Sequence, residues 1–240
     1  MIAKLTISYD GSKYYGSQIQ PSKDTVHGRL QLALKTLGIT SILNFSGRTD
    51  KDVHASQQVV SFELPTYWSN EKKLKEKLIS FMPISIKIHK LEILDYNFHA
   101  RFCTKKRSYR YIISKKELNA FNSSYMAYYN NINIDLINKS CKLFIGVHNF
   151  EYFHKIGSEP ATTNREIYDA RFYEYKDMYI FKFTANSYLR SQIRMMVYAM
   201  IEVSKKNLSL DELKQQIDKK EIFTRRLASP FGLYLSKIYY

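Results

Sequence analysis

Hydrophobic and polar residues alternate with a period of two in several segments of the chain, which is the pattern of strands with one buried face. Residues 2–9 form the first such segment, and the turn-forming sequence Asp10-Gly11-Ser12 follows it. Residues 58–64 are rich in β-branched and aromatic side chains and end at Pro65. Further strands are predicted before the loop at Ser46 and at residues 84–94, 109–113, 165–175, 179–184 and 233–239.

Elsewhere, apolar residues recur every three or four positions, which predicts amphipathic helices. One helix begins near Asp24 and ends at Gly38, a typical stop residue. A second is predicted around residues 74–81, and a third starts near Asn186 with apolar positions through 200. Residues 209–212 have the spacing of a capping box, which predicts a short helix through residue 217.

Strands and helices alternate in two successive halves, and no short repeat, low-complexity tract or long flexible linker interrupts them. We therefore predict an α+β fold with an amino-terminal half at residues 1–95 and a carboxy-terminal half at residues 96–240. The two similar α/β halves are expected to share one continuous, mostly antiparallel sheet flanked by helices.

The charge of the chain is strongly positive. Lys and Arg number 37 against 22 Asp and Glu, a formal net charge of +15, and the chain has 20 Tyr and 14 Phe. Cations interleaved with aromatic rings suit RNA, because they bind phosphates and stack on exposed bases. A composition inflated in Lys, Asn, Ile and Tyr by an AT-rich genome would produce a similar charge, so composition alone leaves both explanations open.

The sequence also bears on location and on metals. The amino terminus lacks an apolar signal core, and no run approaches the roughly 18 apolar residues of a membrane span, so we expect a cytoplasmic protein without membrane association. Cys103 and Cys141 are the only cysteines, too few for a disulfide framework or a four-ligand zinc site.

The loop at residues 46–55 (SGRTDKDVHA) places turn formers, cations and carboxylates between two strand-like segments. Polar groups on such loops are often catalytic. Asp50 has three interpretations here: a carboxylate that caps a turn, a metal ligand or a catalytic group. Asp50, Asp52 and His54 would face one side of an extended backbone, as a divalent-metal site requires, although three ligands do not complete a two-metal centre.

A second polar feature lies on the predicted helix near residue 186. Arg190 and Arg194 share a helical face with Val197 and Ile201, so two cations lead into apolar surface. This arrangement predicts that one arginine is partly buried. A buried arginine needs a counter-ion, and a carboxylate that it keeps ionised would retain nucleophilic character.

The loop resembles the GRTDxxVHA signature of the tRNA pseudouridine synthases of the TruA family. The resemblance extends over nearly the whole chain, because further segments similar to family motifs occur in the same order. They are residues 9–16 (YDGSKYYG), 98–102 (FHARF), 108–113 (SYRYII), 146–150 (GVHNF), 186–194 (NSYLRSQIR) and 232–235 (GLYL).

Position by position, the resemblance implies that Asp50 is the essential catalytic aspartate, that Tyr109 is the active-site tyrosine, and that Arg194 is the charge partner of the aspartate. Without the resemblance, Tyr109 would read as a core aromatic that shares a strand face with Tyr111. In the family interpretation, its ring packs on the extruded uracil and its hydroxyl can help to remove the C5 proton.

Three arginines are candidate RNA contacts. Arg48 resembles the family arginine that accompanies base flipping, although an exposed arginine there could equally bind a phosphate. Arg101 and Arg110 lie near Tyr109 in sequence and could hold the RNA backbone, although such cations often form only a solvated face.

The resemblance further implies the pseudouridine synthase fold and isomerisation of uridine to pseudouridine at positions 38, 39 and 40 of the tRNA anticodon stem-loop. It implies no metal, no organic cofactor and a homodimer that grips the tRNA. Two alternatives remain from the residues themselves: a non-catalytic RNA-binding α+β module, or a metal-dependent nuclease that uses Asp50, Asp52 and His54.

The chain departs from the family pattern at three places. Lys51-Asp52 stands where the family often has Ala-Gly, so any left-handed backbone geometry must be borne by an aspartate. Ser17 replaces a common tryptophan, and Phe231 replaces a common acidic residue. These positions are where local contacts are expected to differ.

Overall fold

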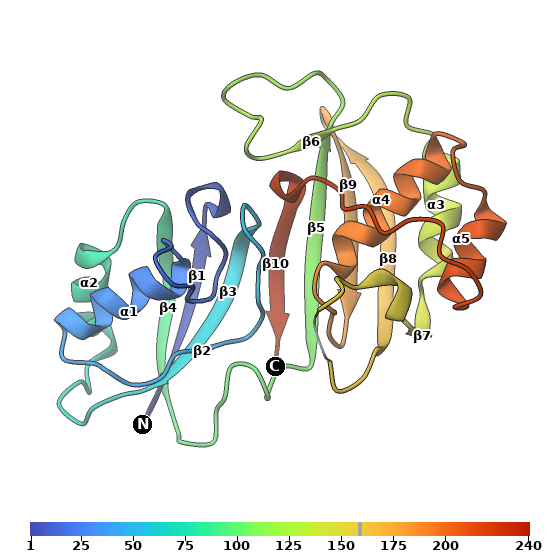
Figure 1. The fold of residues 1–240 in the computed structure, drawn as a ribbon. Coiled ribbons are helices and arrows are strands. Elements are labelled where there is room, and N and C mark those ends of the chain that lie inside the picture. The colour runs from blue at the N-terminus through green and yellow to red at the C-terminus, as the bar shows by residue number, and fades with distance from the viewer. Residues whose placement is uncertain (158–159) are drawn as a thin grey trace. The chain divides into compact units, whose positions relative to one another are not determined.

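The chain folds into two compact units in a computed structural model that describes residues 1–157 and 160–240 (Figure 1). The first unit comprises Met1–Lys105 together with Tyr234–Tyr240, and the second comprises Lys106–Leu233. Each unit contains mostly antiparallel strands flanked by helices. The predicted α+β class is therefore confirmed.

The sheet of the first unit is built around β1 (Ile2–Tyr9), which pairs antiparallel with both β3 (His54–Glu63) and β4 (Ile86–Leu94). The last strand, β10 (Leu233–Tyr239), runs parallel to β3. A two-residue strand, β2 (Asn44–Phe45), pairs with β3 just before the 46–53 loop. The alternation of buried and half-buried residues along β1 agrees with the predicted period of two.

Two helices accompany this sheet, α1 (Val26–Thr36) and α2 (Glu71–Phe81). Both start at the kind of residue that caps a helix, because the side chains of Thr25 and Asn70 accept hydrogen bonds from backbone N–H groups of the first turn. Their apolar faces are buried and the two helices contact each other. A short 3₁₀ helix, η1 (Gly11–Lys13), follows β1.

The second unit has its own antiparallel strands, in the spatial order β5-β9-β8-β7. Their bounds are β5 (Lys106–Ser114), β7 (Gly146–Asn149), β8 (Asn164–Tyr175) and β9 (Met178–Ala185). A two-residue strand, β6 (Ala127–Tyr128), pairs parallel with β5. Short 3₁₀ helices lie at η2 (Glu151–Phe153) and η3 (Pro230–Gly232).

Three helices belong to the second unit: α3 (Ile134–Leu143), α4 (Gln192–Ser204) and α5 (Leu210–Ile217). Most residues of α4 are buried, and it contacts both α3 and α5 (Figure 1). The predicted capping box is confirmed, because Ser209 and Glu212 exchange side-chain to backbone hydrogen bonds at the start of α5. Among the described helices, none has the length and apolar character needed to cross a bilayer.

The predicted start of the third helix near Asn186 is wrong, since α4 begins at Gln192. The Asn186 Oδ1 atom accepts hydrogen bonds from the backbone N–H groups of Glu166 and Ser187, at 3.2 and 2.6 Å. Ser191 then adopts a left-handed backbone conformation, with φ of 61°. An asparagine that bonds local backbone favours an irregular segment over a helical turn, and the left-handed residue delays the helix further.

Candidate active site

The 46–53 loop of the first unit is anchored at its start by a buried glutamine of β3. The Ser46 hydroxyl donates to Gln58 Oε1 at 2.6 Å, and Gln58 Nε2 donates to the carbonyl oxygen of Gly47 at 2.8 Å. Gln58 is fully buried. A buried amide whose donor and acceptor are both used on one loop fixes that loop firmly, because breaking either bond leaves a polar group unsatisfied.

Thr49, the residue before Asp50, is held from the other side. Its backbone N–H donates to the Ser17 hydroxyl at 2.9 Å, and the Ser17 N–H donates to the Thr49 carbonyl at 3.1 Å. The Thr49 hydroxyl lies 2.8 Å from the hydroxyl of Tyr9. Burial raises the pKa of Tyr9 to about 12, so this phenol stays protonated and available for hydrogen bonding.

Asp50 is half-buried and begins a turn, since its carbonyl oxygen accepts a hydrogen bond from the Val53 N–H at 3.2 Å. The neighbours on either side differ: Thr49 is buried and Lys51 is exposed. The carboxylate therefore lies on a loop whose backbone is fixed on both flanks while its outer residues reach solvent. Such a position suits a reactive group that must meet a large substrate.

Tyr109 lies on β5 in the second unit, with only 7% of its surface exposed. Tyr111 is also buried and Arg110 between them is exposed, so the predicted shared face of the two tyrosines is confirmed. The Tyr109 ring packs edge-on against the ring of Tyr188, with centroids 5.2 Å apart and an interplanar angle of 83°. This contact fixes the plane of the Tyr109 ring.

Arg194 lies in the first turn of α4 and is half-buried, whereas Arg190 is exposed. The prediction that one arginine of this face is partly buried is therefore confirmed. Arg194 Nε donates to the Ala228 carbonyl at 2.7 Å, and the Ala228 N–H donates to the Arg194 carbonyl at 3.0 Å. Burial and Tyr129 raise the pKa of the Tyr111 phenol well above its ordinary value, while the charge of Arg194 lowers it.

The remaining candidate arginines are all exposed. Arg48 lies in the 46–53 loop, and the backbone N–H of Arg101 donates to His99 Nδ1 at 3.1 Å. Arg110 lies on β5 opposite Lys182 of β9. Asp50, Arg48 and Arg101 thus belong to the first unit, and Tyr109, Arg110 and Arg194 belong to the second.

Comparison with known proteins gives consistent results for the whole chain. Residues 140–240 match the model of a family described as tRNA pseudouridine synthase. The tRNA pseudouridine synthase A of Campylobacter jejuni (strain RM1221) is 42% identical over 240 residues, which cover 100% of both chains. The chain belongs to the tRNA pseudouridine synthase A family.

Another family member, from Helicobacter pylori (strain HPAG1), is 37% identical over 241 residues, covering 99% of this chain and 98% of that one. Among solved structures, a crystal structure of a Cbf5–Nop10–Gar1 complex is 12% identical, with a TM-score of 0.37. The similarity covers 81% of this chain and 44% of that one.

Two departures from the pattern of the tRNA pseudouridine synthase A family have structural explanations. Ser17 is fully buried, and its hydroxyl accepts a hydrogen bond from the Thr49 N–H, a polar contact that a tryptophan side chain at this position could not make. Asp52 has φ of 65°, so an aspartate does bear the left-handed geometry. Nothing in the structure explains Phe231.

Asp52 offers a direct test of the backbone strain in this member of the family. Because glycine adopts positive φ without a Cβ clash, Asp52→Gly is expected to raise the free energy of unfolding by about 1 kcal/mol. Asp52→Ala, which removes the same charge, is expected to lower it by about 1 kcal/mol. Urea denaturation measures both, and equal destabilisation by the two variants would contradict this account.

Two glycines allow residues 11–17 to pack closely against the loop. A Cβ on Gly11 would lie 2.1 Å from the Val53 carbonyl oxygen. Gly16 has φ of 92°, and a Cβ there would lie 2.7 Å from the Thr49 carbonyl oxygen. Both positions require glycine, because any side chain would push the backbone of the aspartate loop away.

The alternative in which Asp50, Asp52 and His54 form a metal site requires an extended backbone. The backbone is not extended there, because residues 51–52 form a turn and β3 begins only at His54. The buried His54 accepts a hydrogen bond at Nδ1 from the Gly11 N–H at 3.0 Å, and its ring stacks on Tyr234 with centroids 4.6 Å apart. In residues 1–157 and 160–240, no three His, Cys, Asp or Glu residues are grouped to hold a metal ion.

Proposed function

We propose that the protein isomerises uridine to pseudouridine at positions 38, 39 and 40 in the anticodon stem-loop of tRNA. The observation that carries this proposal is the 46–53 loop. Together with the first two residues of β3 it has the family signature, and it presents Asp50 on a backbone held from both flanks. The strongly positive charge and the many aromatic residues agree with an RNA substrate.

The reaction requires few protein groups. The C1′–N1 bond of uridine breaks, the detached uracil rotates, and a C1′–C5 bond forms. The proton at C5 is then removed and N1 carries a proton in the product, so substrate and product have the same composition. We propose Asp50 as the catalytic carboxylate, whether it attacks the sugar, attacks the base or promotes a glycal.

We propose Arg194 as the charge partner of Asp50. A guanidinium beside a carboxylate keeps that carboxylate ionised, which both nucleophilic attack and proton abstraction need. The half-buried position of Arg194 and its hydrogen bond to the Ala228 carbonyl support this assignment, because they orient the side chain and reduce competition from water.

We propose that the Tyr109 ring packs on the extruded uracil and that its hydroxyl takes part in removal of the C5 proton. Tyr109→Phe is then expected to lower kcat by about 10²-fold, because an acid–base group is lost while the ring is kept. Tyr109→Leu should lower it further. The control is Tyr179→Phe, a tyrosine on β9 whose ring stacks on Phe172.

The measurement is single-turnover pseudouridine formation in tRNA labelled with deuterium at C5 of uridine. Loss of the Tyr109 hydroxyl should make C5 deprotonation rate-limiting, so that a primary isotope effect emerges in Tyr109→Phe. If Tyr109→Phe instead reacts at the wild-type rate and shows no isotope effect, the role of Tyr109 is packing alone.

Arg48 is proposed to assist base flipping by filling the space that the extruded base leaves, and Arg101 and Arg110 are proposed to contact the RNA backbone. Their exposure supports these assignments. Extraction of a stacked base costs about a few kcal/mol, which backbone contacts must offset. By resemblance to the family, we further propose a homodimer that acts in the cytoplasm without a metal or organic cofactor.

Synthetic anticodon stem-loops test the assigned positions. Three carry a single uridine, at position 38, 39 or 40, and the control carries cytidine at all three. We expect pseudouridine in each of the three substrates and none in the control. Binding of all four RNAs without conversion would contradict the proposal and favour a non-catalytic RNA-binding module.

A further inference from the structure

A cluster of two cations on one aromatic ring lies beside the Asp50 loop, within the first unit. The ammonium of Lys23 is 4.8 Å from the centre of the Tyr15 ring, and that of Lys51 is 4.7 Å from it. Both lysines are exposed, and 40% of the Tyr15 surface is exposed. We call these three residues the Tyr15 cluster.

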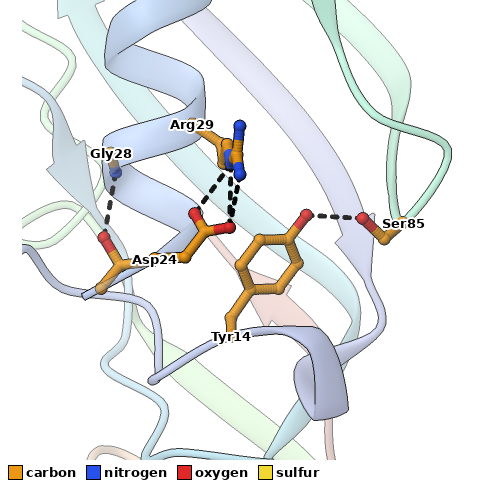
Figure 2. Close-up of polar contacts among 6 residues, drawn as sticks. Tyr14, Asp24, Gly28, Arg29 and Ser85 are labelled. Atoms are coloured by element: carbon orange, nitrogen blue, oxygen red, sulfur yellow. Dashed lines mark hydrogen bonds and ion pairs between the residues drawn. The ribbon is translucent and has the colours of Figure 1, made fainter.

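Three carboxylates adjoin the cluster in sequence: Asp24 beside Lys23, and Asp50 and Asp52 on either side of Lys51. Figure 2 shows that Asp24, the neighbour of Lys23, is gripped by Arg29, with Nε donating at 2.8 Å and a terminal nitrogen donating at 2.6 Å. This fork geometry satisfies the carboxylate. Within the described parts of the chain, neither Lys23 nor Lys51 forms an ion pair.

The position of the cluster relative to the loop is fixed by the backbone. The Tyr15 N–H donates to the Asp24 carbonyl at 2.8 Å, and Gly16 packs against the Thr49 carbonyl oxygen. The preceding residue is tied down as well, because the Tyr14 hydroxyl lies 2.5 Å from the Ser85 hydroxyl (Figure 2). The backbone at Tyr15 is therefore held next to the loop that carries Lys51.

Two exposed ammonium groups on one ring form a local site that favours an anion, although Asp50 and Asp52 adjoin Lys51 in sequence. Both ammonium groups lie within about 5 Å of one ring centroid, so they are at most about 10 Å apart, comparable to the Debye length at physiological salt. They therefore repel each other, and a cation–π contact at an exposed ring is too weak to neutralise them. A shared anion between or beside them would relieve this repulsion.

We propose that the Tyr15 cluster binds an RNA phosphate that flanks the target uridine. Lys51 directly follows Asp50, and consecutive Cα atoms are about 3.8 Å apart, so the backbone of one cluster residue adjoins that of the proposed catalytic residue. The inference rests on the proposed function for the identity of the target. The ring of Tyr15 serves to hold both lysines in place, and the phosphate is the ligand.

Three variants test the lysines. Lys51→Ala and Lys23→Ala, singly and together, are compared with Lys77→Ala. Lys77 is an exposed lysine of α2, and its substitution by alanine also removes one positive charge. Binding of unmodified tRNA is measured as Kd across a series of salt concentrations. We expect each cluster variant to weaken binding about 3- to 10-fold at low salt and to reduce the salt slope by about 1, because one phosphate contact is lost.

Tyr15 provides a second, independent test. Tyr15→Phe keeps the ring face and should bind tRNA like the wild type, whereas Tyr15→Leu should behave like Lys51→Ala. In steady-state assays, the weakened variants should show a raised KM with kcat within about twofold of wild type, the signature of lost ground-state binding.

The inference is overturned if Lys23→Ala and Lys51→Ala match Lys77→Ala in Kd and in salt slope, or if Tyr15→Leu binds as tightly as Tyr15→Phe. The binding measurement does not depend on catalysis. Failure of the wild-type protein to form pseudouridine would instead contradict the proposed function, so the two failures are distinguishable.

Discussion

Asp50→Asn is expected to abolish pseudouridine formation, with kcat lowered by at least about 10³-fold. The amide has almost the shape of the carboxylate, so the loop should fold unchanged, but it is neither a nucleophile nor a base. Binding of tRNA should be retained or slightly strengthened, because removal of a negative charge near the RNA backbone reduces repulsion. Single-turnover conversion of unmodified tRNA and the tRNA Kd measure the two effects.

The matched control for this substitution is Asp52→Asn, which removes the same charge from the same loop two residues away. It should leave kcat within about threefold of wild type, since no chemical role is assigned to that side chain. Residual activity of Asp50→Asn within tenfold of wild type would remove Asp50 from the chemistry. A large loss of kcat in both variants would indicate that catalysis depends on the total charge of the loop and not on the Asp50 carboxylate alone.

Arg194→Gln is expected to have the second largest effect, lowering kcat by about 10³-fold through loss of the positive charge that we propose to pair with Asp50. Arg194→Lys keeps the charge but loses the planar Nε donor that bonds the Ala228 carbonyl, so its kcat should fall between those of Arg194→Gln and the wild type. Single-turnover kinetics at saturating enzyme separate these effects from weakened binding.

Arg190→Gln is the control, because Arg190 precedes α4 by two residues and is exposed. It should change kcat little. Arg194→Gln also breaks a hydrogen bond of a half-buried charged donor, so thermal denaturation should accompany the kinetics. Equal kcat values for Arg190→Gln and Arg194→Gln would contradict the assignment of Arg194 as the charge partner.

Much of the fold could be predicted because local patterns agree with the final structure. The alternation along residues 2–9 matches β1, and the capping box at Ser209 begins α5 as expected. Partial burial of either Arg190 or Arg194 was expected from the apolar helix face that they share, and Arg194 is the half-buried one. In each case the signal lies within a few residues, where chain geometry alone decides which side chains share a face.

Other elements were not predicted. The helix α3 was missed although its sequence carries local signals, because Asn133 caps it and Ile137 and Cys141, four residues apart, are both buried. The strand predicted before Ser46 is the two-residue β2, whereas the two-residue β6 was not predicted, and both pair with longer strands. The return of the last strand to pair with β3 depends on contacts between segments far apart in sequence, which chain order does not reveal.

Some residues of the candidate site could also be predicted from the sequence, and others could not. The loop signature and the family motifs predict Asp50, Tyr109 and Arg194 as site residues from sequence, and a positive φ at position 52 was expected from the missing glycine. The hydrogen bond of His54 could not be predicted from local sequence, because its partner Gly11 is 43 residues away. The Tyr15 cluster could not be predicted, since Lys23 and Lys51 meet only after the fold brings their segments to one ring.

Tritium release tests the central claim most directly, because formation of the C1′–C5 bond must expel the hydrogen at C5 of the target uridine. Purified protein is incubated, in EDTA, with unmodified tRNA that carries tritium at C5 of its uridines. The account predicts stoichiometric release with intact tRNA from the wild type and none from Asp50→Asn. No release by the wild type, release unaffected by Asp50→Asn, or cleavage of the tRNA would contradict it.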